Sequence, residues 1–337
     1  MKAAYVTAYG GPEKIVVGEW DKPTATAPDH VVIEVFAASL NPIDYKRNRG
    51  DMRIMKSETF PHRFGYDVSG IVAETGTGVT NFNVGDAVYA RVDEEEAGTL
   101  AEYVLTTESK CAKKPSNMNH KEAAALPLAA MTALQAFERA GVKNNNFKKA
   151  FITGGAGGVG HYAIQITKNV FGIEEVATTV SEKKMDLIKS LGADVVIDYK
   201  KEKYVEKLSN YDFVFDTTGE VVSTFPIIRK GGHAISIATI PDGDETARLM
   251  PINWFVKSLL NVMSWNTRRL AKVANVNYQY IFLRASGAEL ERIRQWVEEG
   301  KIKSVIDSIY SLDQSAEAMQ KIMDGHATGK IVVEVKA

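Results

Sequence analysis

Phe151-Ile152-Thr153-Gly154-Gly155-Ala156-Gly157-Gly158-Val159-Gly160 is the stretch that decides the fold. An apolar strand runs directly into glycines, and a helix-compatible segment follows from His161 to Phe171. Gly155, Gly157 and Gly160 satisfy G-x-G-x-x-G between a strand and a helix, where missing side chains let the backbone turn sharply and let a pyrophosphate approach. The stretch therefore predicts a dinucleotide-binding turn.

The pattern that follows this stretch predicts an α/β domain. Apolar strands alternate with helix-forming segments, and the predicted elements are a strand at Glu175–Val180, a helix at Glu182–Leu191 and strands at Val195–Ile197, Asp212–Asp216 and His233–Ala238. Nearly all residues of these strands are apolar, as burial on both faces of a sheet requires. Such alternation is typical of right-handed βαβ crossovers in a doubly wound parallel sheet. It favours dinucleotide binding over a glycine-rich turn without a ligand.

Residues at the end of the second strand bear on the choice between NAD and NADP. An acidic residue about 20 positions beyond the glycine fingerprint would bind the ribose hydroxyls of NAD, but no clear candidate is present. Ser181, Lys183 and Lys184 instead offer a hydroxyl and two ammonium groups where NADP carries its extra phosphate. The sequence thus favours NADPH. Glu182 keeps NAD open, and a helix cap formed by Ser181 is the alternative role of this segment.

Composition sets broad limits on function. A chain of 337 residues is long enough for about two domains. The formal net charge of -1 and the lack of a concentrated basic run predict that neither nucleic acids nor membrane surfaces are main partners. We find no secretory signal and no apolar span long enough to cross a bilayer. This predicts a cytoplasmic protein, although removal of a transit peptide is left open.

Cys111, the only cysteine, excludes an intramolecular disulfide and fits a reducing compartment. Neighbouring lysines would make its thiol reactive only if a catalytic partner lay close, so a structural role is favoured.

The predicted secondary structure of the chain changes near Lys121. Before it, short strands separated by Gly, Pro, Asn and Asp predict a β-rich domain, with strands at Ala3–Ala8, Val31–Ala38, Val68–Ala73, Ala87–Val92 and Leu100–Leu105. After it come helix-forming segments, a loop at 144–146 and a helical insertion between Thr239 and Asn277. A strand at Tyr278–Arg284 and a helix at Ala288–Glu299 follow. The last strand, Lys330–Val335, is predicted to return to the N-terminal domain, which would make that domain discontinuous.

Metal ligands are sparse in the sequence. One cysteine cannot build a structural zinc site of four thiolates or mixed thiolates and imidazoles. The six histidines show no pair spaced by four residues and no H-E-x-x-H motif. We therefore predict no metal site, and without a Lewis acid the polarisation of a simple alcohol or carbonyl is harder.

At this point the sequence resembles a known family over its whole length. The matching blocks are Ser39–Arg47, Phe64–Gly70, Gly154–Gly160, Lys189–Asp194, Ile197–Tyr199 and Gly300–Asp307. Together they are similar to the medium-chain dehydrogenase/reductase superfamily, and within it to the zinc-independent quinone oxidoreductase and enone oxidoreductase branch. Zinc-dependent relatives carry Cys at the position of Asn41 and Gly-His-Glu at the positions of Gly65-Tyr66-Asp67, so both departures fit the metal-free branch.

The resemblance implies a Rossmann doubly wound parallel sheet plus a GroES-like partly open β-barrel domain. The GroES-like domain would comprise residues 1–122 and 287–337, and the Rossmann NADPH-binding domain residues 123–286. By position, the residues implied to contact NADPH are Asn41, Lys46, Thr132, Gly155, Gly157, Gly158, Val159, Gly160, Ser181, Lys184, Tyr199, Ile237, Ala238, Phe282, Leu283 and Lys330. For Tyr199 simple packing is the alternative, and for Lys46 a solvated position at the end of a strand.

The resemblance also implies an activity. Hydride would pass from NADPH to a quinone ring or to the β-carbon of an α,β-unsaturated carbonyl, with Lys46 as the catalytic proton donor or relay. The strand Tyr280–Leu283 would pair across a two-fold axis in a homodimer. The alternative is a non-catalytic NADPH-binding scaffold, acting as a redox sensor or an RNA-binding protein, because fold alone does not establish function. The choice between quinone and enone stays open.

Overall fold

The computed structural model describes residues 1–336, without the side chains of Lys143 and Asn144. Two compact units are present: Met1–Met131 with Arg284–Ala337, and Thr132–Leu283. The first boundary lies later than the predicted 122/123, because helix α2 (His120–Ala124) packs on strands β3 (His30–Leu40) and β5 (Asp67–Thr75) of the first unit. The second boundary lies slightly earlier than the predicted 286/287.

The second unit, Thr132–Leu283, contains a parallel sheet, as the alternating pattern predicted. Its strands are β9 (Lys149–Ile152), β10 (Glu175–Val180), β11 (Val195–Asp198), β12 (Tyr211–Asp216), β13 (Ile228–Ser236) and β14 (Asn277–Tyr280). Their order is β11-β10-β9-β12-β13-β14, and every pair is parallel. The chain leaves β9 towards β10 and later returns on the opposite side of β9 as β12. This reversal creates the point at which doubly wound sheets bind ligands.

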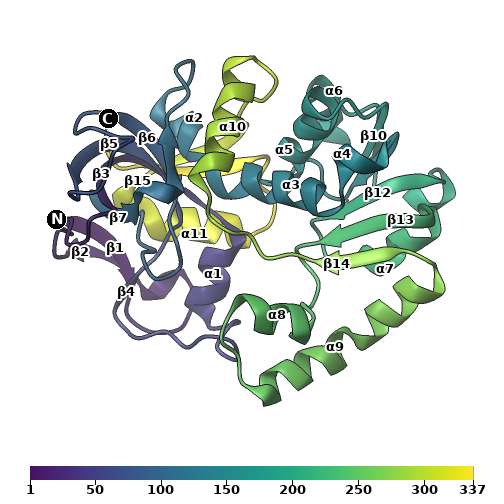
Figure 1. Cartoon of the computed structure of the whole chain (residues 1–337), viewed down its shortest axis with the longest axis horizontal. Coiled ribbons are helices and arrows are strands. Elements are labelled where there is room, and N and C mark those ends of the chain that lie inside the picture. The colour runs from purple at the N-terminus through teal and green to yellow at the C-terminus, as the bar shows by residue number, and fades with distance from the viewer. Residues whose placement is uncertain (337) are drawn as a thin grey trace. The chain divides into compact units, whose positions relative to one another are not determined.

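Helices connect these strands (Figure 1). They are α3 (Pro127–Arg139), which crosses the unit boundary, α4 (Val142–Asn145), α5 (Gly160–Gln165), α6 (Met185–Ser190), α7 (Val221–Thr224), α8 (Gly243–Leu249) and α9 (Trp254–Val273). The loop predicted at 144–146 is partly wrong, since residues 144 and 145 end helix α4. The predicted helical insertion after Thr239 is confirmed as α8 and α9.

Burial of apolar side chains holds the second unit together. All six residues of β12 are buried, and Val214 packs in one cluster with Phe151 of β9 and Ala234 of β13. Each large apolar side chain removed from water contributes about 1.5–3 kcal/mol. Two-sided burial explains why the strands are almost wholly apolar and why the polar residues that remain gather at the strand ends.

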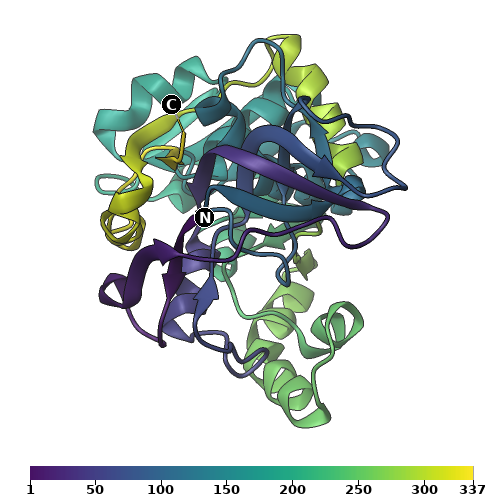
Figure 2. The same ribbon diagram turned by 90° about the vertical axis from the view of Figure 1, so that its left-hand side faces the viewer.

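The first unit contains two sheets, in which all strand pairs but β15–β16 are antiparallel. The smaller sheet has the order β2-β1-β4, with β1 (Lys2–Val6), β2 (Ile15–Glu19) and β4 (His62–Arg63). The larger has the order β15-β16-β3-β5-β6-β8, with β7 paired to β3, and its further strands are β6 (Ala87–Arg91), β7 (Tyr103–Thr107), β8 (Cys111–Lys113), β15 (Ile306–Ser311) and β16 (Lys330–Glu334). The other helices of the unit are α1 (Pro42–Arg49), α10 (Gly287–Glu298) and α11 (Ser315–Met323). Strand β16 lies between β15 and β3, so the predicted return of the last strand is confirmed. Figure 2 shows this yellow C-terminal segment beside the purple and blue N-terminal strands.

Two strand predictions need correction. The strand predicted at Tyr278–Arg284 ends at Tyr280, because the ladder between β13 and β14 stops where Ser236 pairs with Tyr280. Ile281–Leu283, which were expected to pair across a two-fold axis, therefore lie outside the sheet. The strand predicted at Leu100–Leu105 begins at Tyr103 and continues to Thr107, since its pairing with β3 starts opposite Glu34.

Candidate active site

The glycine turn after β9 has different surroundings at each of its glycines. A Cβ added to Gly155 would collide with Thr178 of β10, and one added to Gly160 would collide with the carbonyl oxygen of Gly154. A Cβ at Gly157 would meet only that same carbonyl oxygen, at 3.2 Å. Gly155 and Gly160 are therefore required by packing within the protein, whereas Gly157 borders open space. A pyrophosphate that approaches the backbone at Gly157 fits this arrangement.

Hydrogen bonds to the neighbouring strand hold the turn in place. The backbone N–H of Gly154 donates to Thr179 Oγ1 at 3.1 Å, and that of Gly155 donates to the Thr179 carbonyl oxygen at 3.1 Å. Gly154 itself has φ of +63°, a left-handed conformation that favours glycine. Gly158 and Val159 complete the turn, and Val159 is the residue that precedes α5. The turn is thus a preformed backbone surface.

Asp216, at the end of β12, joins the loops on this side of the sheet. Its side chain is fully buried, and Oδ1 accepts hydrogen bonds from Thr153 Oγ1 at 3.2 Å and from the backbone N–H groups of Gly219 and Glu220 at 3.0 and 3.1 Å. Oδ2 accepts from Ser236 Oγ at 2.7 Å. One carboxylate therefore connects the residues that follow β9, β12 and β13.

This network also positions two residues predicted to line the nicotinamide side. The backbone N–H of Ile237 donates to the Asp216 carbonyl oxygen at 3.1 Å, and that of Ala238 donates to Ser236 Oγ at 3.2 Å. Sequence reasoning missed Asp216, because an aspartate at the end of an apolar strand looks like ordinary loop chemistry. The Thr-Thr-Gly that follows it was the available signal, since it supplies donors for a buried carboxylate.

The ends of β10 and β11 bring Ser181 and Tyr199 onto neighbouring strands. The backbone N–H of Tyr199 donates to the Val180 carbonyl oxygen at 3.3 Å, and the Tyr199 side chain is 59% exposed, so it does not serve as a core residue. Ser181 stands at the start of a short 3₁₀ turn (Glu182–Lys184), but its hydroxyl makes no capping hydrogen bond. The backbone N–H of Lys184 donates to the Ser181 carbonyl oxygen at 2.9 Å. The cap proposed as the alternative role of Ser181 is therefore not formed by its side chain.

Glu182, the acid that kept NAD open, is engaged elsewhere. Its carboxylate lies 2.8 Å from Lys201 Nζ in an exposed ion pair. This pair places a further ammonium group beside the segment that contains Ser181 and Lys184.

Three other predicted cofactor residues lie elsewhere in the second unit. Thr132 is buried in helix α3. Phe282 and Leu283 are half-buried beyond β14, and the Phe282 ring packs edge-on against Tyr280 with 4.9 Å between ring centroids. Thr132 thus comes from a helix, whereas Phe282 and Leu283 come from the segment that follows a strand.

In the first unit, a buried polar cluster surrounds Lys330. We call Ser39, Asn41, Asp67 and Lys330 the Lys330 cluster. The Lys330 ammonium donates to the Leu40 carbonyl oxygen at 3.0 Å and to Asn41 Oδ1, and it lies 3.4 Å from Asp67 Oδ2. Since an ammonium has three protons, these three acceptors account for all of them.

Asp67 collects the remaining donors of the cluster. Its Oδ2 also accepts from Ser39 Oγ at 2.9 Å and from Asn41 Nδ2 at 2.8 Å, and Oδ1 accepts from the backbone N–H of Leu128 at 2.8 Å. Asn41 is 2% exposed and its amide orientation is fixed by two opposite partners, which leaves one N–H for another acceptor. Sequence reasoning named Asn41 and Lys330, which the structure brings together, but gave Asp67 no role.

Burial shifts the proton affinities near this cluster. Desolvation lowers the pKa of Lys330, although Asp67 and Asp44 oppose the shift. Desolvation raises the pKa of Asp44 to about 7, despite the hydrogen bond that its carboxylate accepts from the backbone N–H of Asn41 at 2.7 Å. The cluster is therefore a region in which charge is costly and is tolerated only because donors and acceptors match.

The residues at the positions of the family's zinc ligands do not fit zinc. Asn41 replaces the thiolate, and the Asp67 carboxylate is already occupied by a lysine ammonium and two neutral donors. A divalent cation here would have to displace or repel Lys330, which is a positive charge at the same oxygen. Within residues 1–336 no group of three or more His, Cys, Asp or Glu side chains is arranged to hold a metal ion.

Lys46, the predicted catalytic residue, lies on α1 and contrasts with Lys330. Its side chain is half-buried, and within the described part of the chain its ammonium makes no hydrogen bond or ion pair. An uncommitted lysine can donate to a ligand without first breaking a protein contact. This makes Lys46 a better candidate than Lys330 for a proton donor.

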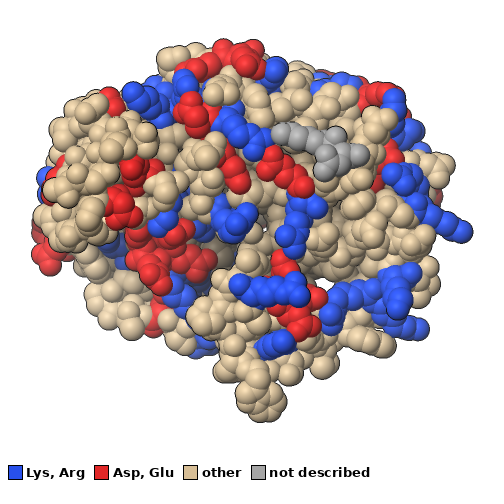
Figure 3. All heavy atoms as spheres, in the orientation of Figure 1, with Lys and Arg blue, Asp and Glu red and all other residues tan. Residues whose placement is uncertain are grey.

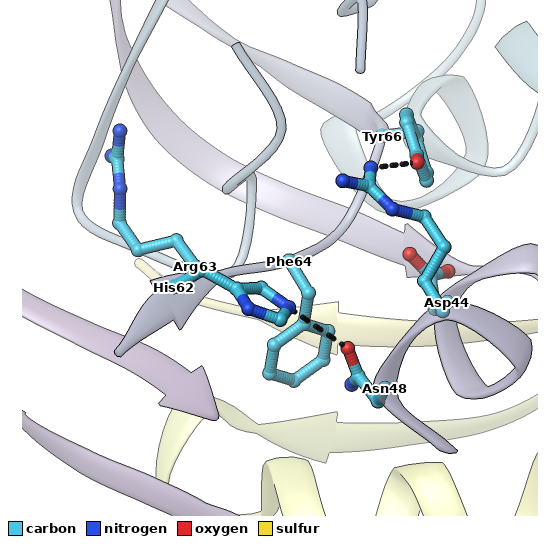
Figure 4. A pocket seen from close by; sticks show the side chains of 7 residues that line it. Asp44, Asn48, His62, Arg63, Phe64 and Tyr66 are labelled. Atoms are coloured by element: carbon cyan, nitrogen blue, oxygen red, sulfur yellow. Dashed lines mark hydrogen bonds between the residues drawn. The ribbon is translucent and has the colours of Figure 1, made fainter. Parts of the chain in front are cut away.

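A small pocket on one side of α1 explains how the helix that carries Lys46 is held (Figure 4). Arg47 makes a two-pronged ion pair with Glu58, at 2.7 and 2.9 Å, and also donates to the Tyr66 hydroxyl. His62 Nε2 lies 3.3 Å from Asn48 Oδ1. These contacts hold α1 in place, so we assign them a structural role, while Asn48 Nδ2, His62 Nδ1 and one guanidinium nitrogen of Arg63 are buried without a hydrogen-bond partner.

Cys111 is a structural residue, as the sequence favoured. Its side chain is 4% exposed in β8, and burial raises the pKa of its thiol. A thiol of raised pKa is a poor nucleophile. We also find no helix in residues 1–336 that is long and apolar enough to span a membrane.

Comparison with known proteins agrees with this geometry. Residues 27–116 match the family described as alcohol dehydrogenase GroES-like domain, and residues 191–333 match the family described as zinc-binding dehydrogenase. The 2-methylene-furan-3-one reductase of Solanum lycopersicum is 33% identical, with 99% of this chain and 79% of the relative covered. The chloroplastic NADPH-dependent alkenal/one oxidoreductase of Arabidopsis thaliana is also 33% identical, with the same coverage.

A solved structure gives the same result for the fold. The quinone oxidoreductase from Coxiella burnetii aligns with a TM-score of 0.85 at 29% identity, covering 100% of this chain and 99% of that one. A Rossmann sheet with an open glycine turn, combined in one chain with a GroES-like unit, defines an oxidoreductase that uses a nicotinamide cofactor. The chain belongs to the medium-chain dehydrogenase/reductase superfamily, in its quinone and enone oxidoreductase branch. The relatives are named as reductases and oxidoreductases, which favours an enzyme over a non-catalytic scaffold.

Proposed function

We propose that this protein is an NADPH-dependent, zinc-independent reductase of quinones or of the C=C bond of α,β-unsaturated carbonyls. The observation that carries the proposal is the glycine turn, in which Gly157 borders open space while Gly155 and Gly160 pack against protein atoms. Ser181, Lys184 and Tyr199 supply the polar groups expected around a 2′-phosphate. The name of the Arabidopsis relative, an NADPH-dependent alkenal/one oxidoreductase, supports the same choice.

Protein groups would hold NADPH along the carboxyl ends of the strands. Backbone N–H groups at Gly158, Val159 and Gly160 would bind the pyrophosphate, which Gly157 lets approach, since the N–H of Gly157 itself donates to the Gly154 carbonyl oxygen at 2.9 Å. The network of Asp216 would keep Ile237 and Ala238 in place on the nicotinamide side. Asn41 would offer its remaining N–H from a fixed orientation. When bound, NADPH supplies the hydride, and the protein contributes orientation and exclusion of water.

The acceptor must gain a proton as well as a hydride. Hydride addition to the β-carbon of an enone leaves negative charge on the carbonyl oxygen as an enolate, and addition to a quinone leaves a hydroquinone anion. A cationic donor aimed at that oxygen lowers the barrier because the charge develops in the transition state. Lys46 is the donor in this proposal, since its ammonium has no partner within residues 1–336.

The acceptor class is tested with purified protein and NADPH. We expect steady NADPH oxidation with 9,10-phenanthrenequinone, 1,4-benzoquinone or small enones. Tight NADPH binding with no turnover on the whole panel would instead support a scaffold. In the native protein, the KM for NADH should be at least ten times the KM for NADPH. Lys184→Gln should bring the two KM values closer together.

The role of Lys46 is tested by Lys46→Ala. We expect turnover to fall by about 10²–10³-fold, in the range typical for loss of a proton donor or an oxyanion donor, while the Kd for NADPH changes much less. Lys189→Gln, an exposed lysine on α6, is the matched control and should leave both quantities unchanged. Native turnover in Lys46→Ala would remove this lysine from the mechanism.

A homodimer and a cytoplasmic location remain part of the proposal. The family counterpart of residues 280–283 supports a two-fold contact, although this segment leaves the sheet after Tyr280. Analytical ultracentrifugation measures the assembly directly. The Arabidopsis relative is named as chloroplastic, so tagged protein viewed in its native cells is the test of location.

A further inference from the structure

Helix α9 has two different faces. Val256, Leu260, Ser264 and Ala271 recur at helical spacing and are buried, so they form the face that packs on the rest of the second unit, where α9 contacts α7, α8 and β14. On a surface helix of a globular protein the opposite face carries charged and polar residues. The opposite face of α9 does not follow this rule.

Large apolar side chains line the outer face of α9. Trp254, Phe255, Val262, Trp265 and Val273 point away from the buried stripe, and each is between 58% and 77% exposed. Two of the four tryptophans of the chain are among them. Isolated exposed apolar residues are ordinary, but a continuous stripe on one helix marks a surface that contacts something else. A helix of 20 residues extends this stripe over about 30 Å.

The charges on α9 are of one sign. Its residues include Lys257, Arg268, Arg269 and Lys272 and no aspartate or glutamate. Lys257 and Arg268 pair with Asp244 and Asp242, whereas Arg269 and Lys272 make no ion pair with any described residue. Figure 3 shows blue side chains over the part of the view where Figure 1 draws the C-terminal half of α9, with uncharged tan surface at its N-terminal end.

Apolar and basic residues therefore share one exposed helical face. Arg269 and Lys272 fall on the same side as Trp265, and the Arg269 guanidinium lies 5.5 Å from the Trp265 ring centroid. Tryptophan is enriched where an apolar phase meets water, and long basic side chains can lay their stems on apolar surface while the charge reaches anionic headgroups. This combination is typical of helices that lie in the plane of a membrane surface.

We propose that α9 docks the protein on an anionic lipid surface, without crossing it. A second copy of the chain fits this face less well, because α9 carries no acidic residue and a contact between two copies of it would bring together two faces of the same positive sign. An anionic bilayer complements both the apolar stripe and the charges. The expectation that membrane surfaces are not partners rested on the net charge of the whole chain and on the lack of a concentrated basic run, whereas the basic residues of α9 are spaced along the sequence and gather only when the helix forms.

The proposal is tested by flotation of the full-length protein with vesicles. We expect binding to vesicles of phosphatidylcholine with about one third phosphatidylglycerol, much weaker binding to pure phosphatidylcholine, and release by added salt. Fluorescence of the native protein should shift to shorter wavelength on binding, since Trp254 and Trp265 leave water. Equal binding to both vesicle types, or no binding to either, overturns the proposal.

Variants of α9 separate the contributions of its apolar and its basic side chains to vesicle binding. Trp254→Ser/Trp265→Ser should abolish most vesicle binding, and Arg269→Gln/Lys272→Gln should lower the partition coefficient by about fivefold for each charge removed. Val84→Ser and Lys189→Gln/Lys230→Gln change exposed residues away from α9 and should bind vesicles as the native protein does.

Two further measurements keep the outcomes distinct. All variants should retain the native unfolding temperature and the native rate of NADPH oxidation, since the altered side chains lie outside the core and the candidate active site. If neither the native protein nor any variant oxidises NADPH, the proposed reductase function is wrong, but the proposal that α9 docks on a lipid surface is not affected. If Trp254→Ser/Trp265→Ser converts a native dimer to a monomer in ultracentrifugation and vesicles bind neither form, α9 contacts a second copy and the membrane proposal is wrong.

Discussion

Two fully buried aspartates, one in each unit, organise their surroundings in different ways. Asp216 in the second unit accepts hydrogen bonds from hydroxyls and backbone N–H groups, all of them uncharged. Asp67 in the first unit accepts from Ser39 and Asn41 but also faces the Lys330 ammonium. The first arrangement holds together the loops that follow three strands, while the second balances one buried charge against another. The two should therefore respond differently to substitution.

The largest loss of stability is expected on substitution of Asp67. Asp67→Ala leaves the Lys330 ammonium buried without its carboxylate, which costs about 3–5 kcal/mol of unfolding free energy. Asp67→Ala/Lys330→Met removes both charges and should recover most of that loss. Urea denaturation of the native protein and both variants measures these differences. A double variant no more stable than Asp67→Ala would show that the charge pair is not what Asp67 contributes.

Asp216 should lose less stability and should not be rescued in this way. Asp216→Ala leaves Ser236, Thr153 and nearby backbone donors without an acceptor, at a cost of about 2–4 kcal/mol. Since its partners described here are uncharged, no removal of a cation compensates. NADPH affinity should fall as well, because the loops after β9 and β13 lose their common anchor. Urea denaturation and titration with NADPH check both expectations, and native NADPH affinity in Asp216→Ala would contradict the account.

The smallest expected change in stability is a pH effect that arises from His120 in the first unit. Burial lowers the pKa of His120 to about 4 from an ordinary value of 6.5, so the folded state favours neutral imidazole. The stability that this provides is complete above pH 6.5 and is lost as the pH falls towards 4. We expect His120→Gln to reduce the loss of stability between pH 6.5 and 4 by about 1–2 kcal/mol. Urea midpoints across this range provide the measurement, and an unchanged slope would show that His120 does not contribute.

Local spacing explains what could be predicted from the sequence. The glycine turn was predictable because the three glycines and the flanking strand and helix lie within about 20 residues. The parallel sheet followed from apolar strands alternating with helices. The end of β14 at Tyr280 was not predictable, because Ile281–Leu283 are as apolar as a strand and only the length of β13 ends the ladder.

Long-range contacts explain what the sequence left out. Lys330 and Asp67 are 263 residues apart, and no periodicity in the sequence indicates that their side chains form a hydrogen bond. Asp216 and Ser236 lie on neighbouring strands, and a pattern of buried residues does not reveal which polar groups bond across them. The resemblance to a known family named Asn41 and Lys330 by position, but the fixed amide of Asn41 and the fully committed ammonium of Lys330 come from the structure.

Calorimetric titration with NADPH tests the central claim most directly, using the native protein and Gly157→Val. The native protein should bind NADPH with one site per chain, and Gly157→Val should fold normally but bind at least tenfold more weakly, because the added side chain occupies the open space at the turn. No heat from NADPH with the native protein, or equal affinity in Gly157→Val, would contradict the assignment of this turn as the cofactor site.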